Sequence, residues 1–257
     1  MSQASYGGKL TVEALCADGF STPWDAPMIP SFPFEFRNVE FLSFAWRTER
    51  RHIEALLPPG LEATSDVVMT HVARMNDTDW VGPFSESNTM VGCRHTASGK
   101  EGSYSLYLFL SSDVGVTHGR EVHGQPKKYG EPSVECRGDA WVGTVSRNGI
   151  DFFTGTMAYK QKKCAPSELE KYFPFKTNIN LKAVNHIDGS AAIRQLTARE
   201  LASVEVLESW TGPCTVELRP NIQAPLFRLP VVEMLDGFYW RANFDLVPGY
   251  TLHDYLA

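Results

Sequence analysis

Residues 119–130, Gly-Arg-Glu-Val-His-Gly-Gln-Pro-Lys-Lys-Tyr-Gly, constrain the local fold more than any other stretch of this chain. Pro126 has a fixed φ and no N–H, and it pushes Gln125 towards an extended conformation. Glycines close the stretch on both sides, so we predict an irregular, extended rim rather than a helix. In an extended segment, neighbouring side chains point to opposite faces. Only one of Lys127 and Lys128 can therefore enter a given pocket, while the other places a positive charge close behind it.

This pair of lysines has two interpretations. The first is ordinary, because most lysines are solvated surface charge. The second is a nucleophile, although a free lysine has a pKa of about 10.4 and only roughly one molecule in 2,500 is neutral at pH 7. Burial and a neighbouring cation both lower a lysine pKa, and a shift to about 7 makes the neutral amine roughly a thousandfold more abundant. Enzymes that form Schiff bases need this larger fraction of neutral amine, so the pair is a candidate catalytic site.

Short apolar runs separated by turn signals predict a chain made mainly of strands. The clearest runs are residues 39–46, 67–74, 104–110 and 238–246. An Asn-Gly turn at 148–149 predicts a hairpin between strands at 136–145 and 150–161. Residues 49–57 form the clearest helix, which Pro-Pro-Gly ends. We find no repeat, low-complexity stretch or interior linker, so we predict a single domain over residues 1–257.

Composition limits the possible partners. The chain has 257 residues, of which 43% are hydrophobic, and can bury a sizeable core. Its formal charge of −6 gives no broad attraction for nucleic acid or an anionic membrane. The five cysteines are widely spread without a Cys-x-x-Cys, which indicates neither a disulfide framework nor a zinc knuckle. The polar start at 1–8 lacks an apolar signal core, and no run reaches about 18 apolar residues. We therefore expect a soluble cytoplasmic protein without nucleic-acid or membrane partners.

The other motifs give little support for a metal or a cofactor. His118, Glu121 and His123 have neither the i, i+4 spacing of a helical pair nor a known zinc pattern. No Gly-x-Gly-x-x-Gly opens a helix after a strand, and no Walker loop occurs. Glu86 stands in a Ser/Asn-rich stretch that we predict to be a loop, where a glutamate is usually just solvated. We expect no metal site and no organic cofactor.

Gly-Arg-Glu at 119–121 followed by Pro-Lys-Lys at 126–128 resembles the signature of the acetoacetate decarboxylase superfamily. Further segments resemble the family in the same order: 21–23, 41–48, 142–144, 156–160, 209–213, 224–226 and 254–256. The resemblance covers nearly the whole chain from Ser21 onward. It implies a mainly β fold of the α+β class, in which an antiparallel sheet curls into a cone-like barrel with a few peripheral helices. It also implies a homo-oligomer.

The resemblance further implies roles for several side chains. Lys127 is expected to form the Schiff base and Lys128 to be the neighbouring cation, an activation for which acetoacetate decarboxylase is itself the standard example. Glu86 matches the active-site glutamate of the family, which lies near the reactive lysine and moves protons for it. The lysine is its own covalent cofactor.

Four positions depart from the decarboxylase pattern. Gln125 replaces the aromatic residue that usually precedes Pro-Lys-Lys, and Val39 replaces a cationic pocket residue. His71 occupies a strand position where the decarboxylase has a glutamate, and Tyr250 appears where the decarboxylase has no tyrosine. Because the resemblance places these positions at the pocket, we expect His71 and Val39 to contact the substrate.

The changes at 125 and 250 favour a reaction other than decarboxylation. An amide can donate hydrogen bonds to a carboxylate that is kept, and a phenol can act as acid or base. The combination resembles a branch of pyruvate aldolase-dehydratases, so we expect pyruvate or a similar 2-oxo acid to condense with an aldehyde and lose water. Lys127 then forms the enamine with help from Glu86, while Gln125 holds the carboxylate and Tyr250 protonates the aldehyde oxygen. Two alternatives stay open: a 3-oxo acid decarboxylase that uses the same lysine, and a barrel that only binds a small acid.

Overall fold

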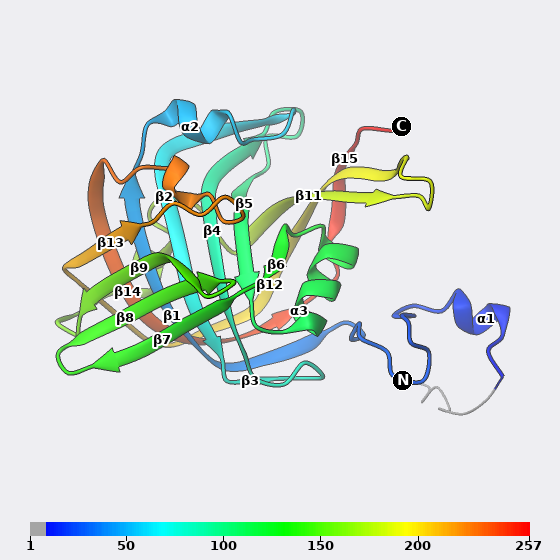
Figure 1. Cartoon of the computed structure of the whole chain (residues 1–257), viewed down its shortest axis with the longest axis horizontal. Coiled ribbons are helices and arrows are strands. Elements are labelled where there is room, and N and C mark those ends of the chain that lie inside the picture. Colours follow the sequence, from blue (N-terminus) through cyan, green and yellow to red (C-terminus); the bar gives the residue numbers. More distant parts are fainter. Residues whose placement is uncertain (1–8) are drawn as a thin grey trace.

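The computed structural model describes residues 9–257 and consists mainly of strands (Figure 1). Residues 1–8, for which the sequence predicts no apolar signal core, lie outside the described range. The main body is an 11-stranded sheet in which neighbours run β12-β11-β5-β4-β2-β1-β14, and β14 pairs back to β12 to close a ring. Its long strands are β1 (Phe34–Arg47), β2 (Leu61–Met75), β4 (Phe84–His95), β5 (Glu101–Leu110), β11 (Thr177–Asn185), β12 (Ala191–Gly212) and β14 (Glu233–Leu246). The ring is antiparallel except where β11 and β5 run parallel, which confirms the predicted barrel.

A second, 4-stranded sheet, ordered β13-β9-β8-β7, lies across the outside of the ring (Figure 1). Its strands are β7 (Glu131–Arg137), β8 (Ala140–Arg147), β9 (Ile150–Ala158) and β13 (Cys214–Leu218). The predicted hairpin is confirmed, because β8 and β9 meet at Asn148 and Gly149 with φ of 55° and 74°. Four short strands pair along the ring: β3 (Asp77–Thr78), β6 (Lys127–Tyr129), β10 (Lys162–Lys163) and β15 (Tyr250–Asp254).

Helices are short and peripheral, as predicted. They are α1 (Val12–Leu15), α2 (Arg50–Glu54) and α3 (Asp113–His118), with a π-helical turn at Gly119–His123 and 3-10 turns at Pro166–Glu170 and Leu226–Arg228. Within residues 9–257, no helix is long and apolar enough to cross a membrane.

Strand β1 buries both of its faces, which explains its nearly continuous apolar sequence. Successive side chains of a strand point to opposite faces. Phe41 and Ala45 belong to the cluster inside the ring. Leu42, Phe44 and Trp46 belong to a second cluster, shared with residues of β8 and β9 in the outer sheet. The core therefore has two layers, one inside the ring and one between the ring and the outer sheet. Strands β1 and β2 separate these layers.

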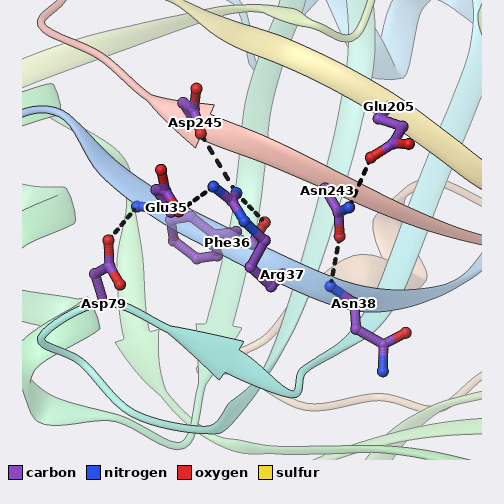
Figure 2. A network of polar contacts seen from close by, with 8 residues as sticks. All are labelled: Glu35, Phe36, Arg37, Asn38, Asp79, Glu205, Asn243 and Asp245. Carbon is purple, nitrogen blue, oxygen red and sulfur yellow. Dashed lines mark hydrogen bonds and ion pairs between the residues drawn. The ribbon is translucent and has the colours of Figure 1, made fainter.

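A β-bulge at Asn38 decides which side chains of β1 face the interior of the ring. The pairing of β1 with β14 shifts between Phe36 and Val39, and Asn38 has a φ of 51°. Phe36 before the bulge and Val39 after it both belong to the inner cluster, so the extra residue changes the alternation. The Asn38 N–H donates to Asn243 Oδ1 at 2.8 Å, which fixes the bulge against β14 (Figure 2).

The stretch before the two lysines begins with a helical turn, so the prediction of an irregular, extended rim is wrong for residues 119–123. Ser112 Oγ accepts a hydrogen bond from the first turn of α3 and starts the helix, which continues into the π-helical turn. Gly124 ends that turn with a φ of 78°, a conformation that favours glycine. Only from Gln125 onward is the chain extended as predicted, because Pro126 cannot continue a helix.

Candidate active site

A pocket inside the ring brings together several of the predicted site residues. It contains about 730 Å³ of empty space, including its open mouth. Its walls are mostly apolar and aromatic, with Phe41, Phe175 and Trp240 among them. Lys127, Glu86, His71 and Gln125 add polar groups to this lining. Such a combination is typical of a small-molecule site.

Lys127 and Glu86 lie in contact in the pocket lining. Lys127 lies on β6 opposite Leu108 of β5, and only 8% of the residue is exposed. Its Nζ lies 3.0 Å from Glu86 Oε2. Glu86 lies on β4, paired with Ala73 on one side and Leu110 on the other, so the prediction of a loop is wrong. Strands on both sides satisfy the backbone there, and the Ser/Asn-rich composition reflects a polar pocket wall rather than solvent.

Gly119 makes room for the lysine. A Cβ at this position would overlap with Cδ of Lys127. The glycine of the Gly-Arg-Glu motif is therefore needed because the lysine side chain lies directly against the backbone of the π-helical turn.

Lys128 points away from the pocket, as the alternation of an extended segment predicts. It lies opposite Phe109, which belongs to the outer cluster, and its Nζ donates to the backbone carbonyl of Gln223 at 3.1 Å. Partial burial, followed by the nearby cations Arg147 and Arg120, lowers the pKa of Lys128. The charge of Lys128 is thus separated from the Lys127 amine by the strand itself.

His71 is a neutral residue of the pocket lining with one unpartnered ring nitrogen in the described chain. Its Nδ1 lies 2.7 Å from Ser43 Oγ, which accepts the indole N–H of Trp240 at 2.9 Å. Because Trp240 can only donate, the Ser43 hydroxyl is free to donate to Nδ1, which leaves the histidine proton on Nε2. Burial lowers the pKa of His71 to about 3, so the ring is neutral. No residue of the described chain partners Nε2.

Gln125 is held by a buried amide network. Its Nε2 donates to Asn178 Oδ1 at 3.1 Å, and Asn178 Nδ2 donates in turn to Ser105 Oγ at 3.0 Å. Gln125 lines the pocket as predicted, but one of its two N–H donors is already used.

Arg199 is a pocket residue that the sequence analysis missed. It lies on β12 and lines the pocket together with Leu201. Its Nε and Nη1 atoms are inaccessible to solvent and have no hydrogen-bond partner among residues 9–257. Burial lowers the pKa of Arg199 to about 10, with Glu86 and Glu200 acting in the opposite direction, so the guanidinium is charged at neutral pH. The available signal was the alternation Thr-Ala-Arg-Glu-Leu, which places the arginine on the same face as Leu201.

The structure does not bring Val39 and Tyr250 to the pocket lining. Val39 is buried in the barrel wall just after the bulge. Tyr250 is 45% exposed and begins β15, which pairs with β12 at Ala198. It borders a separate surface pocket that contains His123.

The two histidines of the rim are close together but hold no metal-like cluster. The ring centroids of His118 and His123 lie 5.0 Å apart. Burial lowers the pKa of His118 to about 3 and lowers that of His123 as well. Across the part of the chain that the structure describes, no three His, Cys, Asp or Glu residues are grouped to hold a metal ion.

The comparisons with known proteins agree on one family. The family model for acetoacetate decarboxylase matches residues 20–256. The acetoacetate decarboxylase of Burkholderia mallei is 32% identical over 238 residues, which cover 93% of this chain and 96% of that protein. The acetoacetate decarboxylase of Chromobacterium violaceum is 34% identical over 237 residues, covering 92% of this chain and 95% of that protein.

Solved structures show the same fold. The acetoacetate decarboxylase of Legionella pneumophila matches with a TM-score of 0.87 and 29% identity, over 97% of this chain and all of that one (100%). The enduracididine biosynthesis enzyme MppR, solved with pyruvate, matches with a TM-score of 0.78 over 92% of this chain and 98% of that one. Its identity is only 19%, so this likeness concerns the fold alone.

These relatives overturn the expected aldolase-dehydratase reaction. Relatives at 32% and 34% identity over most of the chain are named acetoacetate decarboxylase, which favours the alternative reaction of the same lysine. The geometry gives a physical reason for the error. Tyr250 lies outside the lining of the pocket that contains Lys127, and Gln125 donates one N–H to Asn178, so the pair on which the expectation rested does not line one pocket.

Proposed function

Because the chain belongs to the acetoacetate decarboxylase family, we propose that it decarboxylates acetoacetate or a related 3-oxo acid through a Schiff base on Lys127. The observation that carries the proposal is the contact of 3.0 Å between Lys127 Nζ and Glu86 Oε2 in a largely apolar pocket. A buried amine beside a proton acceptor is the arrangement that imine formation requires.

The first half of the reaction joins the substrate to the lysine. Glu86 takes a proton from Lys127, whose neutral amine attacks the ketone carbon and forms a carbinolamine. Glu86 then returns the proton to the hydroxyl group, which leaves as water. The product is an iminium ion next to the carbon that carries the carboxylate.

The second half breaks the C–C bond. Its electron pair moves towards the iminium nitrogen, which gives CO2 and an enamine. Glu86, once it has taken up a proton from solvent, delivers it to the enamine carbon and restores the iminium ion. Water then hydrolyses the iminium ion to release the ketone and free Lys127. In sum, one 3-oxo acid anion and one proton give one ketone and one CO2. The apolar wall favours this step, because loss of CO2 removes the charge of a poorly solvated carboxylate.

The other predicted site residues have indirect roles in this proposal. Lys128, on the outer face of β6, acts on the amine only as a charge behind the strand. Gln125 and His71 shape the polar part of the pocket, with the His71 Nε2–H free to bond a substrate oxygen. Val39 belongs to the apolar cluster inside the ring and packs beside the pocket lining.

The proposal is tested by following labelled CO2 from acetoacetate that carries heavy carbon in its carboxyl group. The native protein should release it, and Glu86→Gln should lower the rate by about 10²–10⁴, the usual contribution of one acid–base group. Glu205→Gln is the matched control, because Glu205 bonds Asn243 on the outside of the ring (Figure 2). If the native protein released no CO2 but made a conjugated 2-oxo acid from pyruvate and an aldehyde, the proposal would be wrong.

A single domain over residues 1–257, a homo-oligomer and a cytoplasmic location stay predictions of the sequence.

A further inference from the structure

We propose that Arg199 binds the carboxylate of the substrate and thereby makes the pocket selective for anionic 3-oxo acids. This inference rests on the proposed function and identifies the substrate group that the pocket recognises.

The Arg199 guanidinium is charged and buried, and two of its nitrogens lack an acceptor. Nε and Nη1 of Arg199 are closed off from solvent and find no acceptor in residues 9–257. Buried donors of a charged group are costly when they stay unpaired, so their presence at a pocket indicates a partner that arrives from outside. A guanidinium is planar and always charged, and a carboxylate is the small anion that pairs with it through charge-assisted hydrogen bonds.

The charges of the pocket lining leave Arg199 uncompensated. Lys127 and Glu86 compensate each other at 3.0 Å, and His71 is neutral. Arg199 is the remaining charged side chain of the described pocket lining, which leaves one net positive charge. Glu200, the next residue along β12, is occupied by Lys100 at 2.9 Å and by the Thr177 hydroxyl at 2.6 Å. A monoanionic substrate therefore neutralises the pocket.

Strand β1 (Phe34–Arg47) supplies no cation to the pocket. The bulge at Asn38 leaves Val39 facing the interior, and the preceding Arg37 lies outside the ring with Glu35 and Asp245 as its ion-pair partners (Figure 2). β12 is joined to β1 through β14, so Arg199 provides the positive charge from a neighbouring part of the same barrel wall.

The contact affects binding more than bond breaking. The ion pair with the carboxylate forms when the substrate binds and lasts until CO2 leaves, so it stabilises the bound substrate and the transition state to a similar extent. Removing Arg199 should therefore raise KM for acetoacetate roughly 10- to 100-fold, the usual effect of a hydrogen bond to a charged group, and change kcat by less than about threefold.

The experiment compares an anionic and a neutral ligand in Arg199→Met, Arg199→Lys and Arg194→Met. Met removes the charge at similar length, and Lys restores it. Arg194 lies on the same strand and donates to the Val184 carbonyl at 2.7 Å, away from the pocket lining, so Arg194→Met is the matched control. Steady-state kinetics with acetoacetate report the anion, and deuterium exchange into acetone, which needs the Lys127 enamine but no carboxylate, reports the neutral ketone.

We expect Arg199→Met to lose acetoacetate kcat/KM by the stated factor while acetone exchange changes by less than about threefold. Arg199→Lys should recover most of the loss, and Arg194→Met should behave like the native protein. An equal loss with both ligands would show that Arg199 acts on the Lys127–Glu86 pair instead, and an unchanged KM would also overturn the inference. Calorimetry with butyrate, which has a carboxylate but no ketone, separates the two proposals. If the native protein decarboxylated nothing, the proposed function would fail, whereas weaker butyrate binding in Arg199→Met would still support the carboxylate contact, and unchanged binding would refute it.

Discussion

The neutral state of His71 predicts a measurable pH dependence of stability. Burial lowers the pKa of His71 from 6.5 to about 3 in the folded protein. As the pH falls below about 6.5, the unfolded chain binds a proton at this position and the folded chain does not, so the free energy of unfolding falls until the pH reaches about 3. Between pH 7.5 and pH 5.0, this linkage amounts to about 2 kcal/mol for one such histidine.

The perturbation that isolates this effect is His71→Asn, which keeps a hydrogen-bonding group near Ser43 but cannot titrate. The smaller side chain lowers stability at both pH values, and this common loss cancels in the difference between them. Urea unfolding at pH 7.5 and 5.0 should show that the acid-induced loss is about 2 kcal/mol smaller in His71→Asn than in the native protein. His186→Asn, at an exposed histidine, controls for removing the residue type. An acid-induced loss equal to that of the native protein would refute the reasoning, since it would mean that His71 takes up its proton in the folded state.

Three further predictions concern the site. Gly119→Ala should lower kcat by roughly 10- to 100-fold with an unchanged circular dichroism spectrum, because the new methyl group displaces the Lys127 side chain from its productive position. Lys128→Met should change the pH profile of kcat/KM far less than Glu86→Gln does, because Lys128 Nζ bonds the Gln223 carbonyl on the outer face. A large shift of this profile in Lys128→Met would show that Lys128 is the main group that activates the Lys127 amine. Tyr250→Phe should leave decarboxylation unchanged within about twofold, because the ring is outside the pocket lining, and a loss near 10² would place the phenol in the proton transfers.

The sequence was informative where local geometry decides the structure. Pro126 made the lysine segment extended, so the opposite orientation of Lys127 and Lys128 followed from alternation alone. The Asn148-Gly149 turn predicted its hairpin because both residues tolerate a positive φ. The barrel itself came from the resemblance to a family, since the pairing of β12 with β14 that closes the ring joins segments that no local pattern connects.

The sequence was misleading where the environment decides the role of a residue. Glu86 looked solvated from its polar neighbours alone, although the family resemblance put it near the lysine. Strands on both sides bring its carboxylate to 3.0 Å from Lys127 Nζ. The bulge at Asn38 changes which side chains of β1 face the interior of the ring. A bulge of one extra residue is hard to recognise in a sequence that mixes aromatic and polar residues. Arg199 was overlooked because its position depends on a strand far along the chain. The aldolase interpretation failed for the same reason, since it joined Gln125 and Tyr250 into one site although only Gln125 lines the pocket.

The most direct test of the central claim is covalent capture of the intermediate. Acetoacetate and borohydride are added to the native protein, and the modified peptide is located by mass spectrometry. The account predicts an irreversible adduct of the reduced imine on Lys127, none on Lys128, and loss of both the adduct and CO2 release in Lys127→Met. Capture at another lysine, or CO2 release that survives Lys127→Met, would contradict the account.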